Sequence, residues 1–375
     1  MLPPPQIVEG DEALCQMVEA LRDEPLLAID TEANSMYSYE TRVCLVQISS
    51  RSADYIIDPF TIRDTSPLGH LLADPQIEKV FHAAEYDLVC LHRQYGFKLV
   101  NLFDTMLAAR VLNAAVVGLA DLLQQHFGVQ VDKSHQQDNW AVRPLSDDSL
   151  RYAQMDTHYL LALRDKQRQA LADLGRLEEA QEVFNDVLLV EIKPHEFDPD
   201  GFWRLTRADQ LTRRQMALLR ELYLLRDDIA RHLNLPPFKV IENYRLIQWA
   251  IRPPSKAQDI NLADGGLHPQ VVKTYSQDIV EAIKRGYQAR LPTRPTPQTP
   301  DPIVADRYVA LHDWRKAVAQ QRRVEANIIM TKHTLWELAR RKPLSLEELG
   351  QIRGLGAWRV AQYGDALLQL LARLK

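Results

Sequence analysis

The chain has 375 residues, of which 46% are hydrophobic and 25% charged, and its net charge is −5. This is the composition of a soluble protein with two or three packed domains. No run approaches the roughly 18 apolar residues of a membrane span, and the start, Met1-Leu-Pro-Pro-Pro, lacks the regions of a signal peptide. We therefore expect a cytoplasmic protein with no membrane segment.

The cysteines Cys15, Cys44 and Cys90 are odd in number, far apart and set in apolar surroundings. This pattern fits neither a disulfide framework nor a zinc site. We expect buried free thiols.

Charge is divided unequally along the chain. Residues 1–200 contain 16 Lys and Arg against 33 Asp and Glu, a net charge of −17, whereas residues 201–375 carry 29 and 17, a net charge of +12. An acidic half joined to a basic half suggests that a polyanionic partner is held by one part and altered by the other. Two solvated faces without a partner would have the same composition, and charge alone does not separate the two interpretations.

The first half combines strand and helix patterns, which indicates an α/β domain. Short apolar runs predict strands at 26–32, 43–49, 55–58 and 79–82. Helical periodicity follows at 85–94, at 105–112 and over a long segment from about 146 to 174. Ser146 is the expected N-cap of that last helix, because Asp147 and Asp148 follow it.

From about residue 203 helix formers dominate. Five prolines within residues 291–302 predict a stiff extended connector. On either side of it lies a weak repeat with an offset of 89, which pairs Arg226 with Arg315 and Leu246 with Leu335. The predicted division is therefore a domain at 1–200, a helical module at 203–290, a linker at 291–302 and a second helical module at 303–375.

Two pairs of polar residues are candidates for chemistry. Asp30 and Glu32 end an apolar strand two residues apart, so their carboxylates leave one face about 6.6 Å from each other. Burying both is costly unless a cation, such as a divalent metal, compensates them. Tyr152 and Asp156 share one face of a helix through their i, i+4 spacing. Each pair alone is also consistent with an ordinary strand end or helix surface, and Asp87 alone with a first-turn helix acid.

Taken together and in order, these residues belong to longer motifs. The motifs are Ile29-Asp-Thr-Glu32, Val80-Phe-His-Ala-Ala-Glu-Tyr-Asp87, Leu102-Phe-Asp-Thr105, Asp132-Lys-Ser-His-Gln-Gln-Asp-Asn-Trp140, Arg143-Pro-Leu-Ser146 and Tyr152-Ala-Gln-Met-Asp156. In these motifs the sequence resembles the DEDD 3′-to-5′ exonucleases, and within them the ribonuclease D family. Tyr152 places the resemblance in the tyrosine subclass. The two repeats resemble HRDC domains.

The resemblance implies an α/β ribonuclease H-like nuclease domain followed by two all-α HRDC helical domains. It implies that two divalent cations, Mg²⁺ or Mn²⁺, support phosphodiester hydrolysis. Asp30 would bridge both ions, Glu32 and Asp156 would bind the ion that activates water, and Asp87 would hold the second ion through water. Tyr152 would orient the attacking water, since a phenol with an ordinary pKa near 10 is a poor base at neutral pH.

The expected function is therefore a 3′-to-5′ exoribonuclease that releases 5′-nucleoside monophosphates. Its expected partners are RNAs with a free 3′ end, such as tRNA precursors and other structured RNAs, and the expected state is a monomer. Two alternatives stay open: a DNA-directed exonuclease of the same superfamily, and a non-catalytic nucleic-acid-binding protein. The metal chemistry does not separate RNA from DNA.

Substrate contacts are expected from polar and aromatic residues outside the acidic set. A cationic and aromatic mix before the last predicted helix could hold phosphates and stack a base. In the second module two arginines flank a Gly-x-Gly turn whose backbone amides could meet a phosphate. A strand-end histidine or a loop tryptophan can equally be structural, and helix-borne arginines can simply face solvent. The candidates are His82, Lys133, Gln137, Trp140, Arg143, Arg353 and Arg359.

Overall fold

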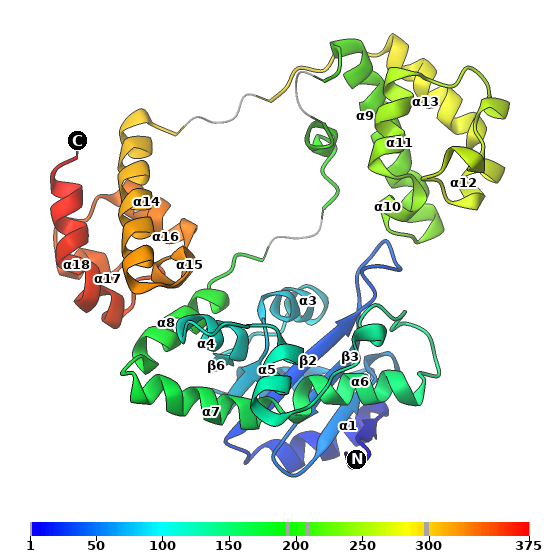
Figure 1. The fold of residues 1–375 in the computed structure, drawn as a ribbon. Coiled ribbons are helices and arrows are strands. Elements are labelled where there is room, and N and C mark those ends of the chain that lie inside the picture. The colour runs from blue at the N-terminus through cyan, green and yellow to red at the C-terminus, as the bar shows by residue number, and fades with distance from the viewer. Residues whose placement is uncertain (1, 193–195, 207–209, 296–299, 375) are drawn as a thin grey trace. The chain divides into compact units, whose positions relative to one another are not determined.

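The computed structural model describes residues 2–192, 196–206, 210–295 and 300–374 (Figure 1). Backbone contacts divide the chain into two compact units. The first unit holds residues 1–33, 43–192 and 299–375, and the second holds residues 34–42 and 193–298. The predicted second helical module therefore groups with the α/β fold. Residues 296–299 of the predicted connector lie outside the described residues.

A six-stranded mixed sheet organises the first unit, in the order β1-β4-β3-β2-β5-β6. Strand β2 pairs antiparallel with β3 and parallel with β5, so it lies at the centre. The four predicted strands are confirmed, and two three-residue strands at the sheet edges are too short for a periodic pattern. The strands are β1 (Gln6–Val8), β2 (Leu26–Ala33), β3 (Val43–Ser49), β4 (Asp54–Ile57), β5 (Glu78–Phe81) and β6 (Leu102–Asp104).

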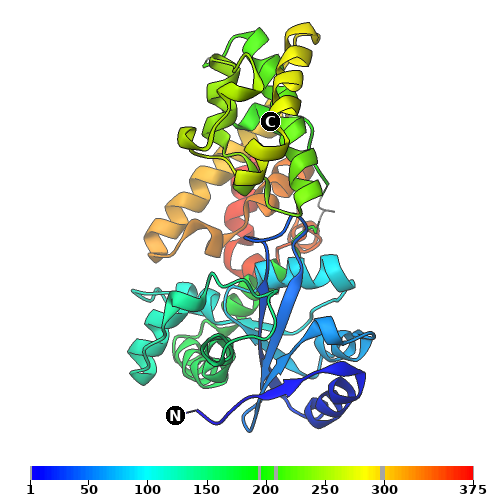
Figure 2. The same cartoon turned by 90° about the vertical axis from the view of Figure 1, so that its right-hand side faces the viewer.

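Helices cover both faces of this sheet, which Figure 2 shows nearly edge-on. Ser146 caps α6 as predicted, because its side chain accepts a hydrogen bond from the Ser149 amide. The predicted long helix is instead two helices that meet at Tyr159, where neither glycine nor proline marks the break. The helices are α1 (Gly10–Leu21), α2 (Ser66–Ala73), α3 (Glu85–Tyr95), α4 (Thr105–Val111), α5 (Leu119–Phe127), α6 (Asp147–His158), α7 (Leu160–Asp173) and α8 (Leu177–Leu188), with 3₁₀ turns η1 (Pro59–Thr61) and η2 (Lys133–His135).

The first helical module lies in the second unit. Its core packs around the long helix α9, whose N-terminus is fixed by a capping box of Thr212 and Gln215. The elements are η3 (Gly201–Arg204), α9 (Arg213–Leu233), α10 (Pro237–Val240), α11 (Asn243–Ile251), η4 (Ala257–Asp259), η5 (Leu262–Asp264), α12 (Pro269–Thr274) and α13 (Ser276–Gln288).

The second helical module repeats a hydrogen bond of the first. Its elements are α14 (Pro302–Arg322), α15 (Ala326–Ile329), α16 (Lys332–Arg341), α17 (Leu346–Gly350) and α18 (Ala357–Ala372). Arg226 donates to the carbonyl of Ile241 in the first module (3.1 Å), and Arg315 donates to that of Met330 in the second (2.9 Å). Donors and acceptors both differ by 89, so the sequence repeat corresponds to a repeated tertiary contact.

The prediction of buried free thiols is confirmed for two of the three cysteines. Cys44 and Cys90 are buried thiols, whereas Cys15 is exposed, because the buried face of α1 is formed by Leu14, Met17 and Leu21.

Among the described helices, none combines the length and apolar character that crossing a bilayer requires.

Candidate active site

Three acids from two elements converge above the centre of the sheet. Asp30 and Glu32 leave the same face of β2, since side chains alternate along a strand. Helix α6 lies over that face and contributes Asp156 from its last turns. One carboxylate oxygen from each residue lies within 4.8 Å of the other two. Within the described residues, this is the one group of three such ligands.

The three carboxylates lie where negative charge is costly. Burial and then the negative charge of Asp156 raise the pKa of Glu32 to about 9. Burial also raises the pKa of Asp156 to about 7, with the nearby Asp87 carboxylate adding to the shift. The pKa of Asp30 lies well above its ordinary value, because of burial first and of Asp87 next. The site thus favours either protons or a cation.

Asp87 lies beside this group, in the first turn of α3, and it is not one of the three clustered ligands. Thr31, which separates the two β2 acids, donates its hydroxyl to Asp87 Oδ1. Burial raises the pKa of Asp87 to about 6. Asp87 therefore contributes charge to the site and is tied to β2 through Thr31, a residue of the first motif to which the sequence assigns no role.

The start of α3 is held from behind by Asp104. Its carboxylate accepts hydrogen bonds from the amides of Ala83 (3.2 Å) and Ala84 (2.9 Å), and also from two amides of α4. Ala83 has a φ of 65°, which an alanine rarely adopts. The two bonds from Ala83 and Ala84 to Asp104 help to hold this conformation, just before the helix that carries Asp87.

Tyr152 lies one turn before Asp156 on α6, as the spacing predicts. Its hydroxyl donates to the Asp156 carboxylate, and burial together with the negative charge of Asp156 raises the pKa of the phenol far above its ordinary value. The phenol is therefore a hydrogen-bond donor and not a base in this site.

A polar network holds α6 against the sheet. Asp54 of β4 pairs with Nδ1 of His158 (2.8 Å) and accepts from Nε2 of Gln154 (2.6 Å). The hydroxyls of Ser49 and Thr157 lie 2.7 Å apart. His158, which follows Asp156, is therefore an anchor of the helix. Periodicity did not reveal this role, because all the partners come from distant strands.

Gln47 is a second residue that the sequence reading missed. It lies directly opposite Asp30 in the β2–β3 register, and its side chain is fully buried. Neither its amide nitrogen nor its amide oxygen has a partner among the described residues. An unpaired buried amide is destabilising by about 1–3 kcal/mol. Its place beside Asp30 makes it part of the polar surroundings of the site.

His82 is placed as a structural residue. Its Nδ1 lies 2.9 Å from the Thr105 hydroxyl. Burial lowers the pKa of His82 to about 4, with the positive charge of Arg110 adding to the shift. The ring is therefore neutral near pH 7 and offers no positive charge to a phosphate.

Trp140 and Arg143, two of the candidates for substrate contact, make contacts within the fold. The Trp140 side chain is 1% exposed and packs near Tyr152. Arg143 binds Asp58 through Nε (2.5 Å) and donates to the carbonyls of Trp140 and Cys44. Lys133 and Gln137, from the same segment, are exposed.

Arg359, another candidate for substrate contact, is likewise bound within the chain. It is 1% exposed and binds both carboxylate oxygens of Asp186 on α8, at 3.0 and 2.8 Å. Arg353 is exposed but donates to the Leu189 carbonyl just after α8 (2.7 Å). The second module is therefore anchored on α8 by the residues assigned to substrate.

The amides at the start of α18 also meet an acid of α8 instead of a phosphate. Glu182 Oε1 accepts from the Trp358 amide (2.7 Å), so a carboxylate occupies the positive end of the helix. A Cβ at Gly356 would overlap the Glu182 carboxylate, so glycine leaves room for this contact. The first amides of α18, which follow the Gly-x-Gly turn, are therefore bound by a carboxylate of the chain itself.

The acidic group fits a divalent cation. Its donors are carboxylate oxygens, which Mg²⁺ and Mn²⁺ prefer. Burial and the charges of the neighbouring acids raise the pKa of all three carboxyl groups, and a bound cation would stabilise their ionised forms. Asp30, Glu32 and Asp156 would hold the ion, and Asp87, tied to Thr31, adds its charge beside them.

Family models match the chain in three places. The model described as 3′-5′ exonuclease matches residues 5–172, and the model described as HRDC domain matches residues 215–283 and 304–371. The first match contains all four acids and Tyr152.

Several known proteins are similar to this chain. Ribonuclease D of Granulibacter bethesdensis is 32% identical over 268 residues, which are 70% of this chain and 67% of that relative. Exosome complex component 10 of Rattus norvegicus is 33% identical over 265 residues, 68% of this chain but 30% of that relative. The chain thus spans about a third of the length of the exosome components that it matches.

A solved structure extends the similarity over the whole chain. The crystal structure of Escherichia coli RNase D, which is described as an exoribonuclease involved in structured RNA processing, matches with a TM-score of 0.67 and 25% identity. The match covers 99% of each chain, so it includes both helical modules.

Proposed function

Because this chain belongs to the ribonuclease D family of 3′-5′ exonucleases, we propose that it is a metal-dependent 3′-5′ exoribonuclease. It would remove 5′-nucleoside monophosphates one at a time from RNA with a free 3′ end. The observation that carries the proposal is the convergence of Asp30, Glu32 and Asp156 within 4.8 Å, beside Asp87 and Tyr152.

The four acids and Tyr152 would have different roles in phosphodiester hydrolysis. Two divalent cations, Mg²⁺ or Mn²⁺, would neutralise phosphate charge, acidify a water and stabilise the leaving 3′ oxygen. Asp30 would bridge the two ions, with Glu32 and Asp156 on one and Asp87 on the other through water. The Tyr152 hydroxyl would orient the attacking water by a hydrogen bond, since its raised pKa prevents it from accepting the proton.

The physiological substrates that we propose are 3′-extended tRNA precursors and other structured RNAs, acted on in the cytoplasm by a monomer. The involvement of the E. coli relative in structured RNA processing supports this class of substrate. We assign residues 1–200 as the nuclease domain, 203–290 and 303–375 as HRDC domains and 291–302 as the linker.

The test of the metal site is Asp30→Asn. Hydrolysis of a single-stranded RNA in Mg²⁺ or Mn²⁺ should be abolished, because the bridging charge is lost, while RNA binding measured in Ca²⁺ persists. Asp173→Asn on exposed α7 surface is a matched control with full turnover. Near-normal turnover of Asp30→Asn would refute the metal assignment.

The same assay separates the alternatives. Matched RNA and DNA strands of one sequence are compared, and faster release of mononucleotides from RNA supports the exoribonuclease. Preferential degradation of DNA would favour the DNA-directed enzyme. If the unaltered chain binds RNA but releases no mononucleotides in either metal, the non-catalytic interpretation holds.

Binding through the basic half is tested separately. Since Arg322, Arg353 and Arg359 serve internal contacts, the exposed cations of the first module are better candidates for phosphate contact. Replacing Arg213, Lys256 and Lys273 by Gln should weaken RNA binding and reduce the salt slope by about 0.7 for each lost contact. An unchanged slope would reject this role.

A further inference from the structure

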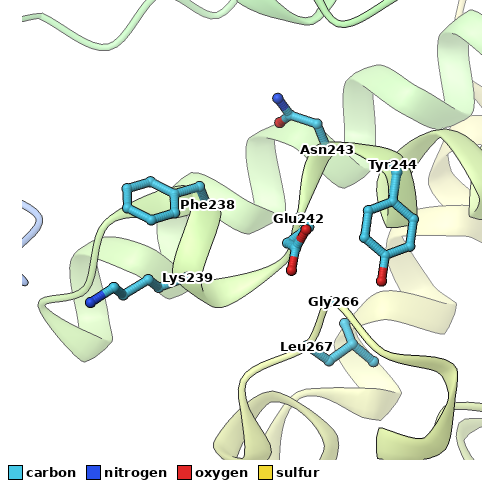
Figure 3. A pocket seen from close by; sticks show the side chains of 7 residues that line it. All are labelled: Phe238, Lys239, Glu242, Asn243, Tyr244, Gly266 and Leu267. Carbon is cyan, nitrogen blue, oxygen red and sulfur yellow. The ribbon is translucent and has the colours of Figure 1, made fainter. Parts of the chain in front are cut away.

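The first helical module contains an open pocket of about 710 Å³ at the turn between α10 and α11 (Figure 3). Phe238 and Lys239 come from α10, Tyr244 opens α11, and Gly266 comes from the turn before α12. Two backbone hydrogen bonds join the α10–α11 turn to the segment before α12. The Glu242 amide donates to the Gly266 carbonyl (2.9 Å), and the His268 amide donates to the Val240 carbonyl (3.0 Å). The pocket is therefore built on fixed backbone.

Two aromatic rings of this pocket face solvent. Phe238 is 44% exposed and Tyr244 is 43% exposed. The Tyr244 ring is held in place, since the Arg245 guanidinium lies 5.4 Å from its centre and the phenol rests on Gly266. Gly266 has a φ of 68°, and any Cβ there would overlap the Tyr244 ring. A pre-ordered exposed ring is a surface on which a nucleobase stacks favourably.

Glu242 lies between the two rings in Figure 3. Its side chain is exposed and makes no capping hydrogen bond to α11. Asn243 points away from it in Figure 3, and its Oδ1 accepts from Arg226 (2.7 Å). A carboxylate repels phosphate, so this pocket is suited to the edge of a base and not to the backbone of a nucleic acid.

A carboxylate accepts two hydrogen bonds side by side. The Watson–Crick edge of guanine offers two adjacent donors, N1–H and the exocyclic amino group. The edges of adenine, cytosine and uracil contain no two adjacent donors. Such edges are accessible in unpaired RNA. Lys239, whose ammonium lies 4.0 Å from the centre of the Tyr37 ring, stands at the rim and can meet a flanking phosphate.

We propose that this pocket binds an unpaired guanine of the RNA, stacked on Tyr244, with the Glu242 carboxylate accepting from its Watson–Crick edge. Phe238 forms the opposite rim, and Lys239 holds the neighbouring phosphate. The inference rests on the proposed function in one respect: it takes RNA to be the ligand of the chain.

The test measures binding of the full chain, in Ca²⁺, to uridine oligomers that carry one guanine, one adenine or no purine. The guanine oligomer should bind at least about fivefold more tightly than the adenine oligomer. Glu242→Gln should abolish this difference, because an amide both donates and accepts. Tyr244→Leu should weaken binding of both purine oligomers. Asp278→Asn, an equal change of charge on an exposed residue of the same module, should leave the preference intact.

Either of two results would overturn the site: equal binding of all oligomers by the unaltered chain, or a guanine preference that survives Glu242→Gln. Circular dichroism of each variant shows that its helices are intact. Release of mononucleotides from guanine-free RNA in Mg²⁺ by the unaltered chain tests the proposed function independently. A guanine preference without such release would leave this site standing and refute the exonuclease.

Discussion

Arg359 of α18 and Asp186 of α8, 173 positions apart in the sequence, form a two-pronged ion pair that is largely buried. A second acid of α8, Glu182, caps the same helix, and Glu179 binds Arg322 of α14 at 2.7 Å. The second helical module is therefore fixed to the nuclease fold by acids of one helix face. Several arginines of the basic half are structural cations.

Arg359→Ala should destabilise the first unit by about 3–5 kcal/mol, because Asp186 is left buried and uncompensated. Urea unfolding followed by circular dichroism measures the effect. Arg340→Ala, which breaks an exposed pair with Glu337, should cost less than about 1 kcal/mol. Replacing both Arg359 and Asp186 by Leu should recover much of the loss. Equal effects of Arg359→Ala and Arg340→Ala would contradict the buried ion pair.

Gly356→Ala should destabilise the same interface by about 1–3 kcal/mol, since its Cβ would displace the Glu182 carboxylate from the start of α18. The matched control is Gly350→Ala in α17, where a Cβ meets no neighbouring atom. That change should be neutral or slightly stabilising, because alanine favours the helix. Thermal unfolding of both variants is the measurement, and a neutral Gly356→Ala would show that the amides of α18 are not bound by Glu182.

The stability of the metal-free protein should fall as pH rises. The folded pKa values of Asp87, Asp156 and Glu32, about 6, 7 and 9, lie above the ordinary values near 4. The folded state therefore binds more protons than the unfolded chain, and this stability is complete below about pH 4 and lost as pH rises through the folded pKa values.

A divalent cation needs the ionised carboxylates, so its stabilising effect should increase over the same range. Melting temperatures in EDTA and in Mn²⁺ at about pH 6 and about pH 8.5 check this expectation. The shift caused by Mn²⁺ should be larger at the higher pH, and Asp156→Asn should reduce it. If the Mn²⁺-induced shift in melting temperature did not depend on pH, these acids would not be the ligands of the metal.

Tyr152→Phe should lower the turnover number by about 10²–10³-fold, because one hydrogen bond to the reacting groups is lost. The pH dependence of the rate should keep its shape, since the raised pKa of the phenol keeps it protonated throughout. Binding of Mn²⁺, measured by calorimetry, should change little because all three clustered carboxylates remain. A displaced pH profile would show that Tyr152 takes part in proton transfer.

Local patterns determined much of this protein from the sequence alone. Strands β2 to β5, the Ser146 cap, the 89-residue repeat and the four acids with Tyr152 could be read because propensity, alternation and motif spacing act over short stretches. The same signals implied the nuclease fold through their resemblance to a known family, and the family matches agree with it.

Only the tertiary structure decided which charged residues are free. Arg143, Arg359 and Trp140 look like ligand-binding residues in the sequence. In the structure, Arg143 pairs with Asp58 and Arg359 pairs with Asp186. Trp140 packs in the core beneath α6. Thr31 and Gln47 gain their importance from Asp87 and Asp30, which reach them from other elements. The physical reason is that burial and ion pairing depend on groups far apart in the chain, and their partners are known only once the chain has folded.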